Sequence, residues 1–310
     1  MPITRISEQA LRVLDAAPGL TIHSVFDSAV NLRAGQRLIT CTARVLSAPH
    51  GVEVTAGDLL RLREHGRRRP GAALRWNPGQ RRITAREGRL VIAAAPILTV
   101  FGVLMPVSGS DGWERAVTCL TRYLTQLKPA TGFGHDWPAL CGDGRFDAAV
   151  TSVAAGRADD AVLYWLGRGP GLTPSGDDVL AGAIATLWST GAFASSPLAS
   201  LRRALDRAAR ERTTEVSAEY LYYACRGMVA GPLRSLLAAL HRADTPAAIA
   251  AVNRLRGYGH TSGMDSILGV IAASRHLAGS GPAVASAGES HRGPGTYPGR
   301  TAGRRLTRLR

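Results

Sequence analysis

The stretch Gly169–Ile184, GPGLTPSGDDVLAGAI, has a near copy in Gly257–Ile271, GYGHTSGMDSILGVI. Both copies run from a glycine-rich segment through Thr and Ser-Gly-x-Asp into an apolar run, with a glycine four residues after the Asp. A Ser or Asp directly before an apolar run is typical of the beginning of a helix. The repeat therefore predicts two related loop–helix elements, and it suggests an internal duplication.

The start of each predicted helix has the chemistry of an anion-binding site. Ser175 precedes Asp178 by three residues and Ser262 precedes Asp265 by three, a spacing that approximates a capping box. The first N–H groups of a helix lack partners within it and lie at its positive end, where phosphate or carboxylate binds. Two interpretations stay open: two capped helices that pack through their glycines, or one ligand site at which both helix starts converge.

If the two starts converge, hydroxyl and backbone N–H groups bind the anionic parts of a ligand. Acidic and imidazole groups then transfer protons, hold a cation or contact an amide. Ser175 needs a base to act as a nucleophile, and His260 is the only histidine inside either motif. The predicted catalytic residues are Asp177, Asp178, His260 and Asp265. The predicted ligand-binding residues are Gly171, Thr173, Ser175, Gly176, Thr261, Ser262, Gly263 and, from the first half of the chain, Asn31.

The first third of the chain has the pattern of β-strands. Short β-branched stretches separated by glycine occur at 22–26 and 30–45, and residues 81–96 alternate around Glu87-Gly88 as a hairpin does. We expect a small, mostly antiparallel barrel or sandwich. Asn31, which lies near a turn of this region, is either a structural residue or part of a site wall.

One uncharged stretch, Leu90–Val107, is long enough to resemble a membrane span. Pro96, Gly102 and Pro106 interrupt it, and an arginine-rich alternating segment precedes it. Proline in a sheet is confined to strand ends, edges and bulges. The stretch therefore predicts two short buried strands joined near Pro96, and no membrane association.

From about Gly112 onward the apolar residues recur with a helical period, as in WERAVTCLTRYLTQL at 113–127. Glycine or proline separates most of the apolar runs, which predicts seven or eight helices. The predicted class is α+β: a β-rich domain over 1–110 followed by an all-helical domain over 111–278. Residues 279–310 contain too few apolar groups to offset their ordering entropy, so we expect a disordered basic tail.

Two other sets of polar residues carry weaker signals. Glu215 and Glu219 are four residues apart and predict a solvated helix face. His135, Asp136 and Asp143 lie in a glycine-rich connector, but their spacing fits no standard metal signature. The sequence also lacks a Walker motif, a dinucleotide-binding fingerprint and a GxSxG elbow, so we expect neither a metal nor a cofactor.

The chain of 310 residues has 38 Lys+Arg and 23 Asp+Glu, a net charge of +15. Most of the excess lies in two arginine-rich segments, 61–89 and 279–310. No aromatic stacking pattern or reading helix accompanies them, which disfavours a nucleic-acid partner. The four cysteines are widely spaced and the first residues lack the apolar core of a signal peptide, so we expect a cytoplasmic protein with reduced thiols.

The paired motifs, GLTPSGDD and GHTSGMD, resemble those of the AllH family, typified by a subunit of the bacterial oxamate carbamoyltransferase of anaerobic allantoin breakdown. The segments 23–43, HSVFDSAVNLRAGQRLITCTA, and 213–227, TTEVSAEYLYYACRG, are also similar to the start of that family and to the helix between its motifs. The resemblance spans roughly His23 to Leu277.

The resemblance implies a cytosolic protein of purine or nitrogen metabolism that takes a small anionic substrate such as carbamoyl phosphate or oxamate. Its expected partners are other carbamoyltransferase subunits or further copies of itself. Three functions stay open: a carbamoyl-transferring enzyme or enzyme subunit, a ligand-binding or regulatory subunit without catalysis, and a nucleic-acid-binding protein that uses the arginine-rich segments.

Overall fold

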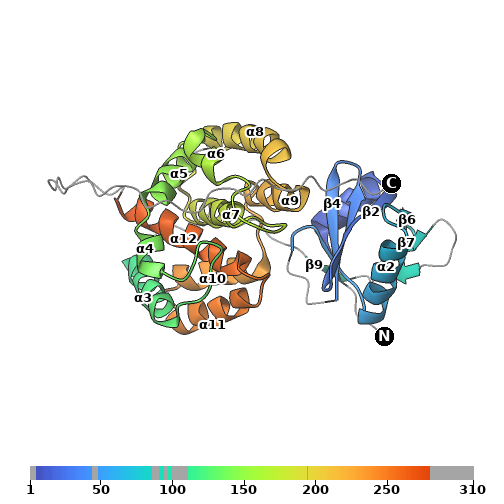
Figure 1. Ribbon diagram of the computed structural model, residues 1–310, viewed down its shortest axis with the longest axis horizontal. Helices are drawn as coiled ribbons and strands as arrows, with labels where there is room; N and C mark the ends of the chain where they lie inside the picture. Colours follow the sequence, from blue (N-terminus) through green and yellow to red (C-terminus); the bar gives the residue numbers. More distant parts are fainter. Residues whose placement is uncertain are drawn as a thin grey trace.

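The computed structural model of the chain describes residues 5–43, 48–85, 91–93, 97–99, 111–193 and 195–279. Within these ranges a curved sheet with two helices comes first, and ten helices follow. Figure 1 shows the two parts side by side along the long axis, with α9 (Glu215–Ala224) where they meet. The predicted α+β class is confirmed.

The sheet has nine strands among the described residues, in the order β8-β7-β6-β2-β3-β4-β5-β1-β9. The pairs β4–β5 and β1–β9 are parallel and the other six neighbouring pairs are antiparallel, so the predicted mostly antiparallel sheet is confirmed. The predicted hairpin is also present as the antiparallel pair β7–β8. The strands are β1 (Arg5–Ser7), β2 (Gly19–Val25), β3 (Ala29–Ala34), β4 (Arg37–Thr42), β5 (Gly51–Glu53), β6 (Ala73–Asn77), β7 (Arg82–Ala85), β8 (Val91–Ala93) and β9 (Ile97–Thr99).

The two edges of the sheet lie close together. β8 and β9 occupy opposite edges, yet only residues 94–96 separate them in the chain. Consecutive Cα atoms are about 3.8 Å apart, so Ala93 and Ile97 are at most about 15 Å apart. The sheet therefore curls into an open barrel. The two strands predicted on either side of Pro96 are confirmed at β8 and β9, and the rest of Leu90–Val107 lies outside the described residues.

The sheet is accompanied by two helices, α1 (Glu8–Ala16) and α2 (Ala56–Arg68). The strand pattern did not predict either of them. Side chains at the residue before each helix cap them, because Ser7 accepts from the Ala10 N–H and Thr55 from the Asp58 N–H. In α2 the buried residues recur with a helical period, but arginines surround them in the sequence and obscure the apolar stripe. The prediction of a β-rich first domain did not include these two helices.

The helical part contains ten helices among the described residues, not seven or eight. The glycine-rich connector holds the short helix α4, and the run from Leu198 to Arg226 divides into α8 and α9 at Thr213-Thr214. Thr214 caps α9 by accepting from the Ser217 N–H at 3.0 Å. The other helices are α3 (Asp111–Leu127), α4 (Trp137–Cys141), α5 (Gly144–Ala154), α6 (Asp160–Trp165), α7 (Ser175–Ser189), α8 (Ser195–Arg212), α10 (Gly231–His241), α11 (Thr245–Arg256) and α12 (Ser262–Gly279).

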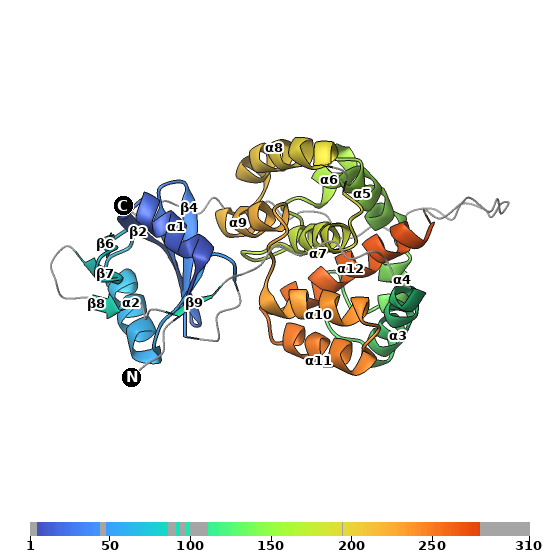
Figure 2. The same ribbon diagram turned by 180° about the vertical axis from the view of Figure 1, so that it is seen from behind.

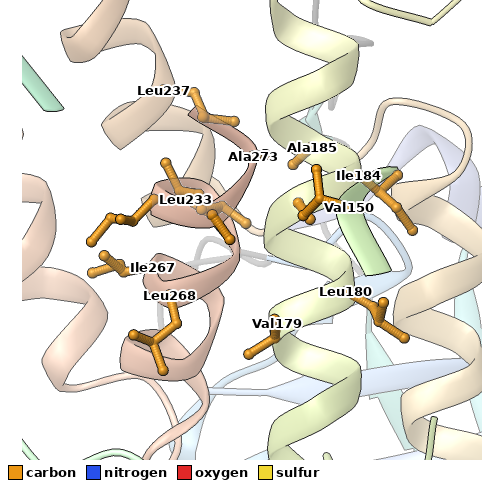
Figure 3. Packing of buried hydrophobic residues seen from close by; sticks show 14 of the residues in the cluster. Val150, Val179, Leu180, Ile184, Ala185, Leu233, Leu237, Ile267, Leu268 and Ala273 are labelled. Carbon is orange, nitrogen blue, oxygen red and sulfur yellow. The ribbon is translucent and has the colours of Figure 1, made fainter. Parts of the chain in front are cut away.

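Helices α7 and α12, which begin with the two glycine-rich motifs, form the centre of this part. They make the most extensive helix–helix contact among the described elements. In both views α5, α6 and α8 lie on one side of this pair and α10 and α11 on the other (Figures 1 and 2). Figure 3 shows Val179 extending from α7 toward α12, whereas Leu180 and Ile184 extend from the opposite side of α7 into the surrounding core.

Within the described ranges, no helix combines the length and the apolar character needed to cross a bilayer. Of the predicted tail, only Gly279 is described, as the last residue of α12. The rest of 279–310 lies outside the described residues.

Candidate functional site

In both glycine-rich motifs the glycine after the serine packs against the backbone of the preceding helix. The two loop–helix elements are therefore similar in structure as well as in sequence, and the similarity includes how each packs on the helix before it. A Cβ added at Gly176 would overlap the carbonyl of Trp165, the last residue of α6, and one at Gly263 would overlap the carbonyl of Leu255 in α11. Each of these glycines thus lets the new helix start directly against the end of the preceding one. Both were predicted to bind a ligand, and the structure gives each a packing role.

The predicted capping boxes are wrong for a reason visible in the backbone. The cap of α7 is Pro174, which makes no side-chain hydrogen bond, so Ser175 is the first residue inside the helix. Ser262 is likewise the first residue of α12. Each serine lies beside the aspartate of the other motif instead. Burial raises the pKa of Asp178 and of Asp265, and the hydroxyls of Ser262 and Ser175, respectively, oppose these shifts.

A cavity of about 800 Å³ lies between the curved sheet and the helices. Strands β3, β4 and β5 line one wall, and α7, α9, α10 and the start of α12 line the other. Arg254 is the only cationic side chain among the described residues that line it. The other polar lining is made of hydroxyl, amide and carboxyl groups: Ser28, Asn31, Thr40, Thr42, Thr173, Asp178, Tyr220, Ser235, Tyr258, Ser262 and Ser266.

On the sheet side, a hydrogen-bonded row across three strands fixes Asn31. Its amide nitrogen donates to the Ser24 hydroxyl at 3.1 Å on β2, and its carbonyl oxygen accepts from the Thr40 hydroxyl at 2.7 Å on β4. The register of β2 against β3 shifts between Ile22 and Ser24, which turns Ser24 toward Asn31. Asn31 is buried within β3 and lines the cavity, and its role as a ligand-binding residue stays a prediction.

On the helix side, Asp178 contributes a largely buried carboxyl group to the cavity lining. Its Oδ2 is inaccessible to solvent and has no hydrogen-bond partner among the described residues. Burial raises its pKa well above the ordinary value, Ser262 and Thr173 lower it in part, and the charges of Asp265 and Asp177 raise it again. A carboxyl group with a raised pKa is a stronger base than an exposed one, as proton transfer requires.

Residues 165–274 match the family model described as oxamate carbamoyltransferase subunit AllH. This match runs from the last residue of α6 into α12 and covers less than half of the chain. It contains both glycine-rich motifs, including the cavity residues Thr173, Asp178 and Ser262. No solved structure matches the chain. The resemblance that the two motifs indicated is thus confirmed for residues 165–274, which are called the AllH region below. Asn31 lies outside the match.

Asp177, within the AllH match, holds the first motif to α9. Its Oδ1 accepts from the Gly167 N–H at 2.8 Å, and its Oδ2 accepts from the Ser217 hydroxyl at 2.7 Å and from the Thr213 hydroxyl. Burial nevertheless raises its pKa. It does not line the cavity, and its role as a catalytic residue stays a prediction.

The other predicted residues of the AllH region divide by position. Ser175 and Asp265 are buried and do not line the cavity, whereas Ser262 does. His260 and Gly171 are exposed, and Thr261 is half-buried; none of the three lines the cavity. The structure therefore brings Asn31, Thr173, Asp178 and Ser262 together around one space and leaves the others outside it.

The sequence did not reveal a buried cluster that joins the AllH region to the sheet. Glu219, predicted on a solvated face, is only 5 % exposed; it accepts from the Leu38 N–H at 3.3 Å and pairs with Arg37 at 2.7 Å. Burial raises its pKa to about 7, although Arg37 opposes this shift. The solvated-face prediction fails for Glu219, because the face it occupies is covered by β4. Glu215, one turn earlier, is more exposed and pairs with His23 and Arg33.

Aromatic rings complete this cluster. His50 stacks on Tyr223 with ring centroids 5.2 Å apart and meets the edge of Tyr220 at 4.9 Å. Burial and the charge of Arg37 lower the pKa of His50 to about 3, so the ring is neutral. Tyr220 also lines the cavity, and its hydroxyl lies 3.2 Å from that of Tyr258. In the sequence, only the run of tyrosines after Glu219 indicated that this helix packs against the sheet.

The residues considered as metal ligands have local structural roles. Asp136 and Asp143 cap α4 and α5 by accepting from backbone N–H groups, and His135 contacts the Lys128 carbonyl. In the part of the chain that the structure describes, no group of three or more His, Cys, Asp or Glu side chains is arranged to hold a metal ion.

Proposed function

We propose that this chain is the AllH-type subunit of an oxamate carbamoyltransferase, and that the cavity between sheet and helices binds its small carboxylate and amide substrates. One observation carries the proposal: the residues of the AllH match that begin α7 and α12 meet Asn31 of the sheet around one space. A site between two parts of a fold, with few polar groups converging on it, is the usual place for a small ligand.

In the proposed reaction, the amide nitrogen of oxamate attacks the carbonyl carbon of carbamoyl phosphate. A carbon–nitrogen bond forms, the carbon–oxygen bond to phosphate breaks, and the nitrogen loses a proton. Because an amide nitrogen is a weak nucleophile, a nearby base lowers the barrier. Asp178 is the proposed base, since its carboxyl group lines the cavity and burial raises its pKa.

The leaving phosphate gathers negative charge, and fixed donors stabilise it. The hydroxyls of Thr173 and Ser262 lie 2.7 Å apart at the starts of α7 and α12. The start of α10 also borders the cavity at 230–233 and lacks a side-chain cap; Pro232 has no N–H, so Gly231 and Leu233 are the proposed donors to an anion there. Arg254 supplies the one positive charge among the described lining residues.

The word subunit in the family description supports partner chains, and we propose that this chain works beside them in the cytoplasm. The described cysteines are unpaired, which fits a reducing compartment. Calorimetric titration of the purified chain with carbamoyl phosphate and with oxamate tests the site, and phosphate release with both present tests catalysis. Binding with turnover supports an enzyme, and binding without turnover supports a ligand-binding subunit. Failure of both compounds to bind contradicts the proposed site.

A further inference from the structure

The pair of Asp178 and Ser262 at the edge of the cavity is repeated by the pair of Asp265 and Ser175 between the same two helices. Each Asp–Ser pair is called a corner below. Asp178 lies three residues after Ser175 in α7, and Asp265 lies three residues after Ser262 in α12. The contacts cross over: the Ser262 hydroxyl is close to Asp178, and the Ser175 hydroxyl is close to Asp265. Two corners of the same chemical composition therefore lie between α7 and α12, and only the first lines the cavity.

The protein itself fills the second corner. The N–H of Gly132 donates to Asp265 Oδ1 at 2.9 Å. Gly132 also lies directly against Ser175, because a Cβ added at Gly132 would overlap the Ser175 hydroxyl. The loop is held in place by a bridge in which the Thr131 N–H donates to the Gly134 carbonyl at 2.9 Å. A backbone amide thus occupies the pocket between Asp265 and Ser175.

The first corner has no such occupant. It borders the 800 Å³ cavity, and among the described residues no backbone N–H donates to Asp178 as that of Gly132 does to Asp265. Since the two corners present the same groups, the occupant of the second indicates the chemistry that suits the first.

We propose that Asp178 accepts the N–H of a ligand amide beside Ser262, as Asp265 accepts the N–H of Gly132 beside Ser175. The ligand's anionic end then points away from Asp178, because two negative charges in contact repel each other. The inference rests on the proposed function for the identity of the ligand, and it assigns the amide end of oxamate to this corner.

The test compares oxamate with oxalate, which replaces the amide by a second carboxylate. Both are titrated calorimetrically at pH 8 into the full chain, into Asp178→Asn and into Asp147→Asn. Wild type should prefer oxamate by about tenfold or more, the loss expected when a buried acceptor is left without its donor. Asp178→Asn should remove that preference, because an asparagine side chain can turn a donor or an acceptor toward the ligand. Asp147→Asn makes the same chemical change on α5, where Asp147 pairs with Arg275 outside the cavity, and should keep the preference.

Equal affinities for oxamate and oxalate in wild type would overturn the inference and leave the proposed function intact. So would tighter binding of oxalate, which would indicate that a protonated Asp178 donates to an oxyanion. A preference that survives in a folded Asp178→Asn would also overturn it. If that variant fails to fold, the wild-type comparison still decides. Failure of oxamate, oxalate and carbamoyl phosphate all to bind would instead contradict the proposed function.

Discussion

Gly269 of α12 lies directly against Val179 of α7: a Cβ added at Gly269 would overlap the Val179 carbonyl and stand 2.8 Å from the Ala183 nitrogen. The reciprocal contact exists one turn away, where Gly182 of α7 meets the Ser266 carbonyl. The two helices thus touch backbone to backbone at two related points. This close approach brings the start of each helix beside the aspartate of the other.

Substitution of either glycine by alanine should therefore destabilise the protein although alanine favours helices. We expect Gly182→Ala and Gly269→Ala each to lower the free energy of unfolding by about 1–3 kcal/mol, as overpacking does. Gly57→Ala is the matched control, because Gly57 is exposed in α2 and has room for a Cβ. It should be neutral or stabilising. Urea denaturation of the three variants measures this, and unchanged stability at 182 and 269 would mean that the helices can separate without cost.

The two serines should differ in effect although their sequence contexts match. Ser262 lines the cavity, whereas Ser175 does not and lies against Gly132. Ser262→Ala should weaken oxamate or carbamoyl phosphate binding by roughly tenfold through loss of one hydrogen bond. Ser175→Ala should lower the melting temperature and leave affinity unchanged. Titration and thermal melts on both variants decide, and equal losses of affinity would place Ser175 in the site as well.

Glu219 should make the protein less stable as the pH rises. Its pKa is raised from 4.5 to about 7 in the folded chain, mainly by burial. Between these values the folded chain binds a proton that the unfolded chain has released, so this contribution is complete below pH 4.5 and disappears as the pH passes 7. Glu219→Gln should flatten the decline in urea stability between pH 5 and 8. Glu215→Gln is the matched control. Arg33 and His23 lower the pKa of Glu215 although its burial opposes this shift, so the variant should leave the decline in stability between pH 5 and 8 unchanged.

His50 should act in the opposite direction. Burial lowers its pKa from 6.5 to about 3, so below pH 6.5 the unfolded chain binds a proton that the folded chain excludes. This contribution to stability is therefore lost as the pH falls from about 6.5 toward 3. His50→Phe keeps a ring between Tyr220 and Tyr223 and should reduce the loss on acidification. His260→Gln changes an exposed histidine and should not. An unchanged acid slope in His50→Phe would show that His50 is accessible to protons in the folded protein.

The sequence predicted those features of the fold that depend on residues close together in the chain. The strand-rich first part, the helical second part and the duplicated motifs were all visible because each depends on a local pattern. The capping boxes failed by one position: Pro174 occupies the cap of α7, which moves Ser175 into the helix and frees its side chain for Asp265. The spacing of Ser and Asp is the same in both arrangements, so spacing alone does not distinguish them.

Local sequence patterns could not predict the cavity, because its walls come from segments that lie far apart in the chain. Asn31 and Ser262 meet around it although more than 200 residues separate them. The burial of Glu219 depends on β4, which precedes it by a similarly long stretch. Within its own helix, a carboxylate four residues after another has the pattern of a solvated face. Only packing against the sheet changes that environment.

The distribution of the cavity wall along the chain has a consequence for synthesis. The sheet wall, β3 to β5, leaves the ribosome first, and domains generally fold in that order. The wall on α9 and α10 follows much later, and Ser262 and Ser266 come near the end of the described residues. A nascent or prematurely terminated chain that lacks α12 therefore has no Asp178–Ser262 corner. Substrate binding at this corner would then distinguish finished chains from unfinished ones.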